Sequence, residues 1–284
     1  MSAEAAFPAA DGEETGAREG LRAALRAWPG LWRAGVASAV AYRAEFLIWM
    51  LTTNMPLVML ALWAAVARGG PVAGYTGPAF TAYYLATLWV RLLTGCWVVW
   101  ALTMEIRSGT LGLRLLRPLH PLVAYAAENL AAVPLRAVVS LPVVALLLWT
   151  SSGALSRDPV HWLLLPPAML GAWLLIFLVM AFIGTLALYV ESALTLFQLW
   201  LSISAVLSGY LVPLDLFPAW LRAWADVLPF RFLLSFPVEL ILGRPTRLEA
   251  LRLFATQWAY VLAFGVATQA LWRVGLRRFG AFGG

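Results

Sequence analysis

The side chains in this sequence that could take part in chemistry are few, and the basic ones are all arginines. The 284 residues include 20 basic side chains, none of them lysine, and the formal net charge is +6. Guanidinium groups bind phosphates and carboxylates through paired hydrogen bonds. An ATP-binding phosphate loop would need a glycine-rich turn that ends in lysine. The chain is therefore not expected to bind and hydrolyse ATP itself.

Other kinds of catalytic site also lack a complete set of residues. The two histidines, His120 and His161, are expected near opposite membrane faces with no His or Cys partner nearby, which argues against zinc. We find no Gly-x-Ser-x-Gly elbow and expect no Ser/His/Asp set on one side of the membrane. The arginines are too dispersed along the chain for a nucleic-acid site. We expect no catalytic residue, no metal, no directly bound cofactor and no nucleic acid partner.

The composition is too apolar for a soluble globular domain, because 62% of the residues are hydrophobic and only 12% are charged. A segment of about 20 apolar residues crosses the hydrocarbon core of a bilayer. We predict an all-α polytopic membrane protein with a disordered cytosolic tail at 1–17 and one domain at 18–284, which begins with an interfacial helix at 18–42. Its six expected transmembrane helices are 45–67, 80–103, 129–150, 162–190, 194–212 and 251–273.

The distribution of arginine predicts the orientation, because short cytoplasmic loops are enriched in basic residues. With the N-terminus inside, the expected outer short loops contain only Arg68 and Arg157. Both termini and the loop at 104–128 are then cytosolic. The outer segment at 213–245 is cut by proline into pieces too short to span. We expect helices at Pro218–Leu228 and Phe230–Leu242 that re-enter the outer leaflet; the alternative is an extracellular cap with no gating role.

One charged residue falls in the middle of an expected span. Arg91 lies within 80–103, where an ionised side chain costs several kcal/mol unless it meets water, carbonyl groups or a partner. It either faces a cavity, with Thr94, Gly95 and Val98 on the same helix face, or extends its guanidinium toward the outer interface, as Arg136 is expected to do toward the inner one.

The fifth expected span carries two pairs of polar residues at helical spacing. Gln198 and Ser202 share one face of the helix, and Ser204 and Ser208 share another. Such small or polar residues either pack spans closely or line a path.

The stretch from Glu105 to Pro121 is a charged, amphipathic insert between two apolar runs. A helix over Glu105–Arg117 would place Arg107, Thr110, Arg114 and Arg117 on one polar face. Leucines and Ile106 would cover the rest, and Pro118 and Pro121 would end the helix. Such an insert predicts a contact with something outside the bilayer.

Three stretches of the sequence carry a resemblance to a known family. They are Tyr42–Phe46, Glu105–Leu111 with Leu115–Pro121, and Ser208–Pro218 followed by Leu228–Phe230. With them, nearly the whole chain resembles bacterial permease subunits of the ABC type 2 transporter class. The similarity is to a six-span branch long described only as a domain of unknown function.

The resemblance implies an exporter of the bacterial cytoplasmic membrane. Two permease chains, identical or paralogous, would sit among membrane lipids, and each would dock a separate ATP-binding subunit that holds ATP and Mg. The coupling helix would be Glu105–Arg117, and the spans one, two and five would surround the path. The implied coupling residues are Glu105, Ile106, Arg107, Gly109, Leu111 and Arg114; those of the path are Arg91, Thr94, Gln198 and Ser202; those of the outer gate are Pro218, Trp220, Pro229 and Phe230.

Two other classes of membrane protein remain open at the level of sequence. A secondary transporter or channel driven by an ion gradient would place ionisable pairs or broken helices at the midplane, where only Arg91 qualifies. A lipid-modifying enzyme embedded in the membrane would need clustered acids, bases or metal ligands at one face. The sequence does not identify the cargo.

Overall fold

The structure is a computed structural model that describes residues 30, 33, 37 and 54–279. Apart from an isolated bridge between Val72 and Tyr75, the described residues form helices and turns, which confirms the predicted all-helical class. The predicted tail at 1–17, nearly all of the interfacial helix at 18–42, and the start of the first span lie outside the described residues.

Four stretches of the described chain are long and apolar enough to cross a membrane, whereas six spans were predicted. The four stretches are formed by α4 (Gly77–Thr94) with α5 (Val98–Arg107), by α7 (Pro121–Ala131) with α8 (Val133–Ser151), by α9 (Pro159–Thr185), and by α13 (Arg247–Phe279). The first two stretches therefore each contain two consecutive helices. The first and fifth predicted spans correspond to shorter apolar helices, α3 (Met55–Val66) and α10 (Ala193–Leu207).

The fifth predicted span is short because the backbone turns after Leu207. Gly209 adopts a φ of 83°, which an L side chain rarely adopts and which ends a helix. The Tyr83 hydroxyl donates to the Gly209 carbonyl at 2.7 Å, and the Ser235 hydroxyl donates to the Ser208 carbonyl at 2.7 Å. These bonds satisfy carbonyls that would otherwise be unpaired in an apolar region.

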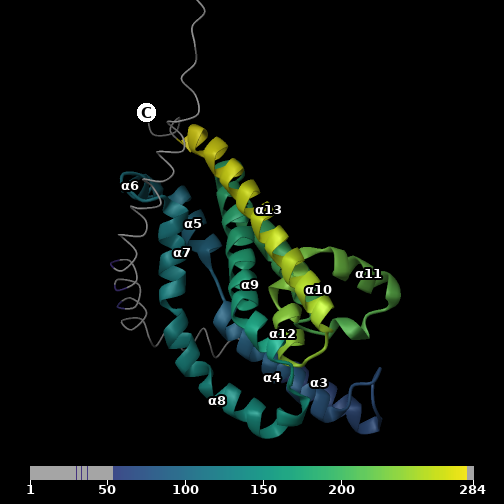
Figure 1. Ribbon diagram of the computed structural model, residues 1–284. Coiled ribbons are helices and arrows are strands. Elements are labelled where there is room, and N and C mark those ends of the chain that lie inside the picture. Colours follow the sequence, from purple (N-terminus) through teal and green to yellow (C-terminus); the bar gives the residue numbers. More distant parts are fainter. Residues whose placement is uncertain (1–29, 31–32, 34–36, 38–53, 280–284) are drawn as a thin grey trace, which may run out of the picture.

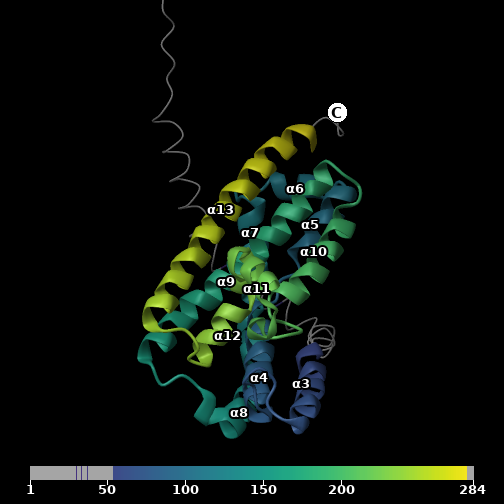
Figure 2. The same ribbon diagram turned by 90° about the vertical axis from the view of Figure 1, so that its right-hand side faces the viewer.

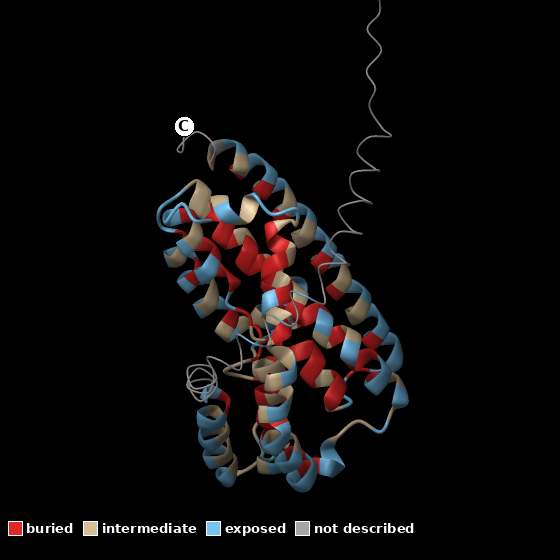
Figure 3. Ribbon diagram, turned by 90° about the vertical axis from the view of Figure 1, so that its left-hand side faces the viewer, coloured by how far each residue is buried: buried red, intermediate tan, exposed pale blue. Residues whose placement is uncertain are grey.

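Helix α9 forms the centre of the structure, and α13 runs along much of its length (Figure 1). Figure 3 shows the buried residues concentrated around this central helix. The outer face of α13 carries exposed Leu262 and Val266, as expected where a helix meets lipid or another chain. The loop with α6 (Leu111–Leu115) and the end of α13 lie at one end of the molecule, and α3 and the end of α8 lie toward the other (Figure 1).

A buried glutamine joins three elements at the centre of the fold. The Gln257 amide on α13 donates to the Ala168 carbonyl of α9 at 3.0 Å and to the Phe232 carbonyl at 3.1 Å. Phe232 belongs to η5 (Pro229–Leu233), in the segment predicted to be outside. The amide fits because Gly171 has no side chain: a Cβ there would lie 2.8 Å from Gln257.

We predict that Gly171→Ala destabilises the protein by about 1–3 kcal/mol, because the new methyl group forces Gln257 away from both carbonyls. Thermal unfolding of the purified protein in detergent measures the effect. Gly265→Ala in α13 is the matched control, since its Cβ would meet Leu178 at an ordinary 3.8 Å. Equal melting temperatures for the two variants would contradict the role of Gln257.

Candidate functional site

The second predicted span is broken near its middle. Helix α4 ends at Thr94, Gly95 is extended with a ψ of 134°, and α5 starts only at Val98. The predicted shared face of Arg91, Thr94, Gly95 and Val98 is therefore wrong beyond Thr94, because a single helix does not connect them. Thr94 is buried and its hydroxyl donates to the Val90 carbonyl at 2.9 Å within its own helix.

Arg136 on α8 satisfies the backbone at this break. Its guanidinium donates to the Gly95 carbonyl, and its side chain is buried rather than extended to the inner interface as predicted. A positive charge at a helix C-terminus is favourable, because the last carbonyls there have no helical donor. The break and Arg136 therefore stabilise each other.

Arg91 lies one turn before the break and lines a cavity of about 390 Å³. Its guanidinium carbon is 5.8 Å from the centre of the Tyr210 ring, within the range of a cation–π contact. The other lining residues are mostly apolar and come from α3, the break between α4 and α5, α9, α10 and the segment after α10. They include Met55, Ile176, Leu201, Ala205, Leu233 and Leu234, together with the aromatic Trp97 and Trp200 and the polar Ser204 and Ser208.

The four residues that the resemblance assigned to a path are not brought together in this chain. Gln198 and Ser202 lie on an exposed face of α10, where the Ser202 hydroxyl donates to the Gln198 carbonyl at 3.0 Å. Ser204 and Ser208 line the cavity instead. Figure 2 shows α10 alongside α5 and α9. The i, i+4 spacing identified both faces of α10, but only the packing shows which of them meets Arg91.

The predicted coupling helix at Glu105–Arg117 is not continuous. Helix α5 ends at Arg107 because Gly109 adopts a φ of 75°, the left-handed conformation that commonly follows a helix C-terminus. The five-residue α6 follows, with Leu111 fully buried. Pro121 does not end this helix but occupies the first turn of α7. Proline is tolerated there because a backbone N–H in the first turn has no acceptor within the helix. The predicted single polar face is therefore wrong.

Arg114 turns inward and ties the loop to α5 and α7. Its guanidinium lies 2.7 Å from both the Glu105 and Glu128 carboxylates, and 4.2 Å from the centre of the Tyr125 ring. The Tyr125 hydroxyl donates to Glu105 at 2.7 Å. Burial disfavours the charge, but hydrogen bonds to Glu128 and Glu105 raise the pKa of Arg114 above its ordinary value. We call Glu105, Arg114, Tyr125 and Glu128 the loop cluster.

The outer side of the loop presents a different surface. The Leu113 and Leu116 side chains are 65% and 83% exposed. Arg107 is exposed as well, and its guanidinium donates to the Glu191 carbonyl in the turn before α10. Ile106 is buried beside Leu111 in the core. Sequence reasoning found Glu105 and Arg114 but missed Tyr125 and Glu128, because they belong to the next helix.

The segment predicted to be outside forms short helices, of which only the first has nearly the predicted length. Pro218 precedes α11 (Ala219–Val227), and the second predicted piece is divided at Leu234 into η5 and α12 (Ser235–Ile241). Of the residues assigned to an outer gate, Trp220 is exposed on α11, and Pro229 and Phe230 begin η5.

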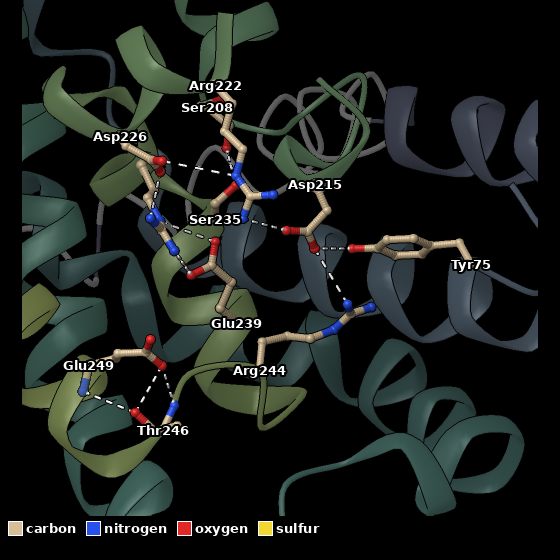
Figure 4. Close-up of polar contacts among 11 residues, drawn as sticks. Tyr75, Ser208, Asp215, Arg222, Asp226, Ser235, Glu239, Arg244, Thr246 and Glu249 are labelled. Carbon is tan, nitrogen blue, oxygen red and sulfur yellow. Dashed lines mark hydrogen bonds and ion pairs between the residues drawn. The ribbon is translucent and has the colours of Figure 1, made fainter. Parts of the chain in front are cut away.

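Ion pairs connect these short helices, as Figure 4 shows. Asp215 accepts a hydrogen bond from the Tyr75 hydroxyl at 2.8 Å and lies 3.4 Å from Arg244. Arg231 pairs with Asp226 and Glu239, each at 2.7 Å. Burial and the nearby Asp215 raise the pKa of Tyr75, so its phenol stays protonated as a donor.

Comparison with known protein families assigns the chain to a family. A model described as ABC-2 family transporter protein matches residues 49–283, which include α3 to α13, the cavity and the loop cluster. The chain belongs to the ABC-2 family of transporter proteins. A comparison with curated proteins gave no match. Together with the apolar helices, the family makes this a membrane-integral transport protein of a type that is usually non-catalytic.

One pair of residues in this ABC-2 family protein does resemble part of a hydrolase site, against the sequence expectation. Ser156 Oγ lies 2.7 Å from His161 Nδ1, just before and within the start of α9. Asp158 is close in the chain, but its carboxylate accepts from the Val160 amide and from Arg247. The Arg247 hydrogen bond lowers the pKa of Asp158. Asp158 caps the start of α9 and links it to α13 through Arg247.

We predict that Arg136→Met lowers the stability of this ABC-2 family protein by about 1–3 kcal/mol, because it leaves the partly buried Gly95 carbonyl without its charged donor. Thermal unfolding in detergent is the measurement. Arg117→Met, at an exposed position, is the control and should change the melting temperature little. A melting temperature for Arg136→Met equal to that of the control would show that the break does not depend on Arg136.

Proposed function

We propose that this chain is the permease subunit of an ATP-driven ABC exporter in the bacterial cytoplasmic membrane. Two permease chains form the path, and each couples to a separate ATP-binding subunit through the loop at 105–117. ATP and Mg are bound by that partner, and both termini lie in the cytosol. The observation that carries the proposal is the loop itself, which is rigid on its inner side and apolar on its outer side.

The rigidity comes from the loop cluster. Arg114 is held by two carboxylates at 2.7 Å and by the Tyr125 ring, so the loop cannot shift without breaking charged contacts. Charge-assisted hydrogen bonds of this kind are the strong ones, particularly when they are partly buried. Because the loop is fixed to α5 and α7, a movement imposed on it by a partner would be transmitted to the rest of the permease.

The surface for the partner is supplied by Leu113 and Leu116. Exposed leucines at the end of a helical bundle, in the same loop region as the exposed Arg107, are typical of a protein interface. They lie just after α5, whose other end reaches the break beside Arg91. Helix α5 therefore connects the loop directly to the cavity, so that a movement of the loop would be transmitted along this one helix.

The second permease chain is proposed to contact the exposed face of α10. Gln198 and Ser202 lie there with the exposed Leu199 and Ile203, so the face combines apolar contact area with hydrogen-bonding groups. The short helices at 213–245 would close the outer end of the path, and their ion pairs would hold them as one unit. Arg91, Pro218, Trp220, Pro229 and Phe230 keep their proposed roles in path and gate.

The docking surface is tested with Leu116→Asp. We expect loss of an ATP-binding subunit that otherwise co-purifies from the native membrane, because a charge replaces apolar contact area while the permease itself stays folded. Mass spectrometry of the purified complex identifies the partner by its lysine-containing phosphate loop. Leu248→Asp, 58% exposed at the start of α13, is the matched control.

Two results would contradict the proposal. One is an intact complex and normal ATP-driven transport in Leu116→Asp. The other is the absence of any ATP-binding partner, with transport in vesicles that contain an ion gradient and no ATP. The second result would favour an ion-driven transporter.

Coupling is tested separately at Gly109. Gly109→Val forces a β-branched residue into a φ of 75°, which we expect to cost about 1–2 kcal/mol and to change the direction of the loop. Transport per ATP hydrolysed should fall, while the protein still inserts into the membrane. Gly112→Val in α6 is the matched control, since both positions have open space around them but only Gly109 has positive φ. Unchanged coupling in Gly109→Val would show that the loop conformation is not needed.

A further inference from the structure

We propose that the cavity beside Arg91 binds an amphipathic anion, with a carboxylate or phosphate group at Arg91 and an apolar body against the tryptophans and leucines. This substrate class deepens the proposed transport function and rests on it. The cavity is lined by residues of this one chain, so the site can be tested without knowing the second permease.

The charge of Arg91 is the first reason. Its guanidinium carbon lies 5.8 Å from the centre of the Tyr210 ring, and no carboxylate of the described residues lies within 4.0 Å of it. A partly buried guanidinium among apolar helices needs a counter-charge or water. The other arginine near the break, Arg136, donates to the Gly95 carbonyl and adds a second positive charge to the region. An incoming anion would meet the guanidinium of Arg91, which has no carboxylate partner among the described residues.

Two further donors lie in the same cavity. Ser208 and Tyr210 line it, and neither hydroxyl makes a hydrogen bond to another described residue. Ser204 differs, because its hydroxyl donates to the Leu201 carbonyl at 2.9 Å. Arg91, Ser208 and Tyr210 thus offer donors without protein acceptors. A cation would find no acidic group among the described lining residues, whereas a carboxylate or phosphate would satisfy all three donors.

The rest of the lining sets the shape and character of the ligand. The cavity volume of about 390 Å³ falls in the range of small-molecule pockets. Its walls are largely apolar, with Trp97 and Trp200 among them. A small hydrophilic anion would leave these walls in contact with water, so an anion with an apolar body fits better. Free amphiphiles and the anionic headgroups of lipids share this chemistry.

The test uses the full-length chain in nanodiscs of zwitterionic lipid. The probes are three brominated twelve-carbon chains that end in a carboxylate, a phosphate or a neutral alcohol. Bromine quenches tryptophan fluorescence, and Trp200→Phe identifies the part of the signal that comes from the cavity. We expect both anionic probes to bind at least about tenfold more tightly than the alcohol, as for one desolvated charge pair.

Three variants separate the charge from the fold. Arg91→Gln should abolish the preference for anions without changing the affinity for the alcohol, and Arg91→Lys should retain part of the preference. Arg68→Gln removes an exposed arginine far from the cavity and should behave as wild type. Size-exclusion profiles verify that each variant is folded. Equal affinity for all three probes, or an anion preference that survives in Arg91→Gln, would overturn the proposal.

A second arm of the experiment distinguishes a lipid headgroup from a free amphiphile as the source of the anion. It also separates failure of the substrate class from failure of the proposed permease function. If added anionic phospholipid competes with the probes and the competition needs Arg91, a lipid headgroup is the ligand; if it does not compete, the ligand is a free amphiphile. Both results support the amphipathic anion. Anion preference in a chain that recruits no ATP-binding subunit would refute the proposed function alone. An assembled, ATP-driven complex without anion preference would refute the substrate class alone.

Discussion

The carbonyl of Gly95 is the constraint on which the other features depend. Because it follows the last residue of α4 within an apolar stretch, it has lost the amide donor that a continuing helix would supply. Arg136 supplies the missing donor from α8. With that bond made, α4 can stop at Thr94 and α5 can take its own direction. The stop leaves Arg91 near a helix end, beside a cavity rather than within a continuous wall of side chains.

Sequence reasoning located the apolar runs, the midspan arginine and the charged loop, because these are local in the chain. It missed the break at Gly95, since one glycine in an apolar run is usually tolerated within a helix. Arg136 could not be assigned to Gly95 because a long-range contact joins them. The helix end before Gly109, by contrast, could have been predicted, because a glycine just after Arg107 and Ser108 is a recognised helix-stop signal. The prediction followed the helical periodicity of the leucines instead.

The segment between α10 and α13 combines core burial with ion pairs. Phe232 of η5 and Phe236 of α12 are fully buried in the core. Arg231 connects the more exposed α11, through Asp226, to Glu239 on α12. Ion pairs contribute geometry more than stability when they are partly buried. Gln257 adds a fixed point between this segment and α9. The spacing of the prolines predicted that this segment is divided into short helices. The ion pairs between those helices could be identified only from the folded structure.

Helix α5 has the length and position of a lever arm between the break and the loop cluster. Its ten residues are about 15 Å long at the usual helical rise. One end is next to the Arg136-capped break and the other carries Glu105 of the loop cluster. A swing of about 10° around the break moves the far end of a helix of this length by about 3 Å, while atoms next to the pivot move only a fraction of that. Small adjustments around Arg91 and larger displacements of the loop would then be the two ends of one rigid-body motion.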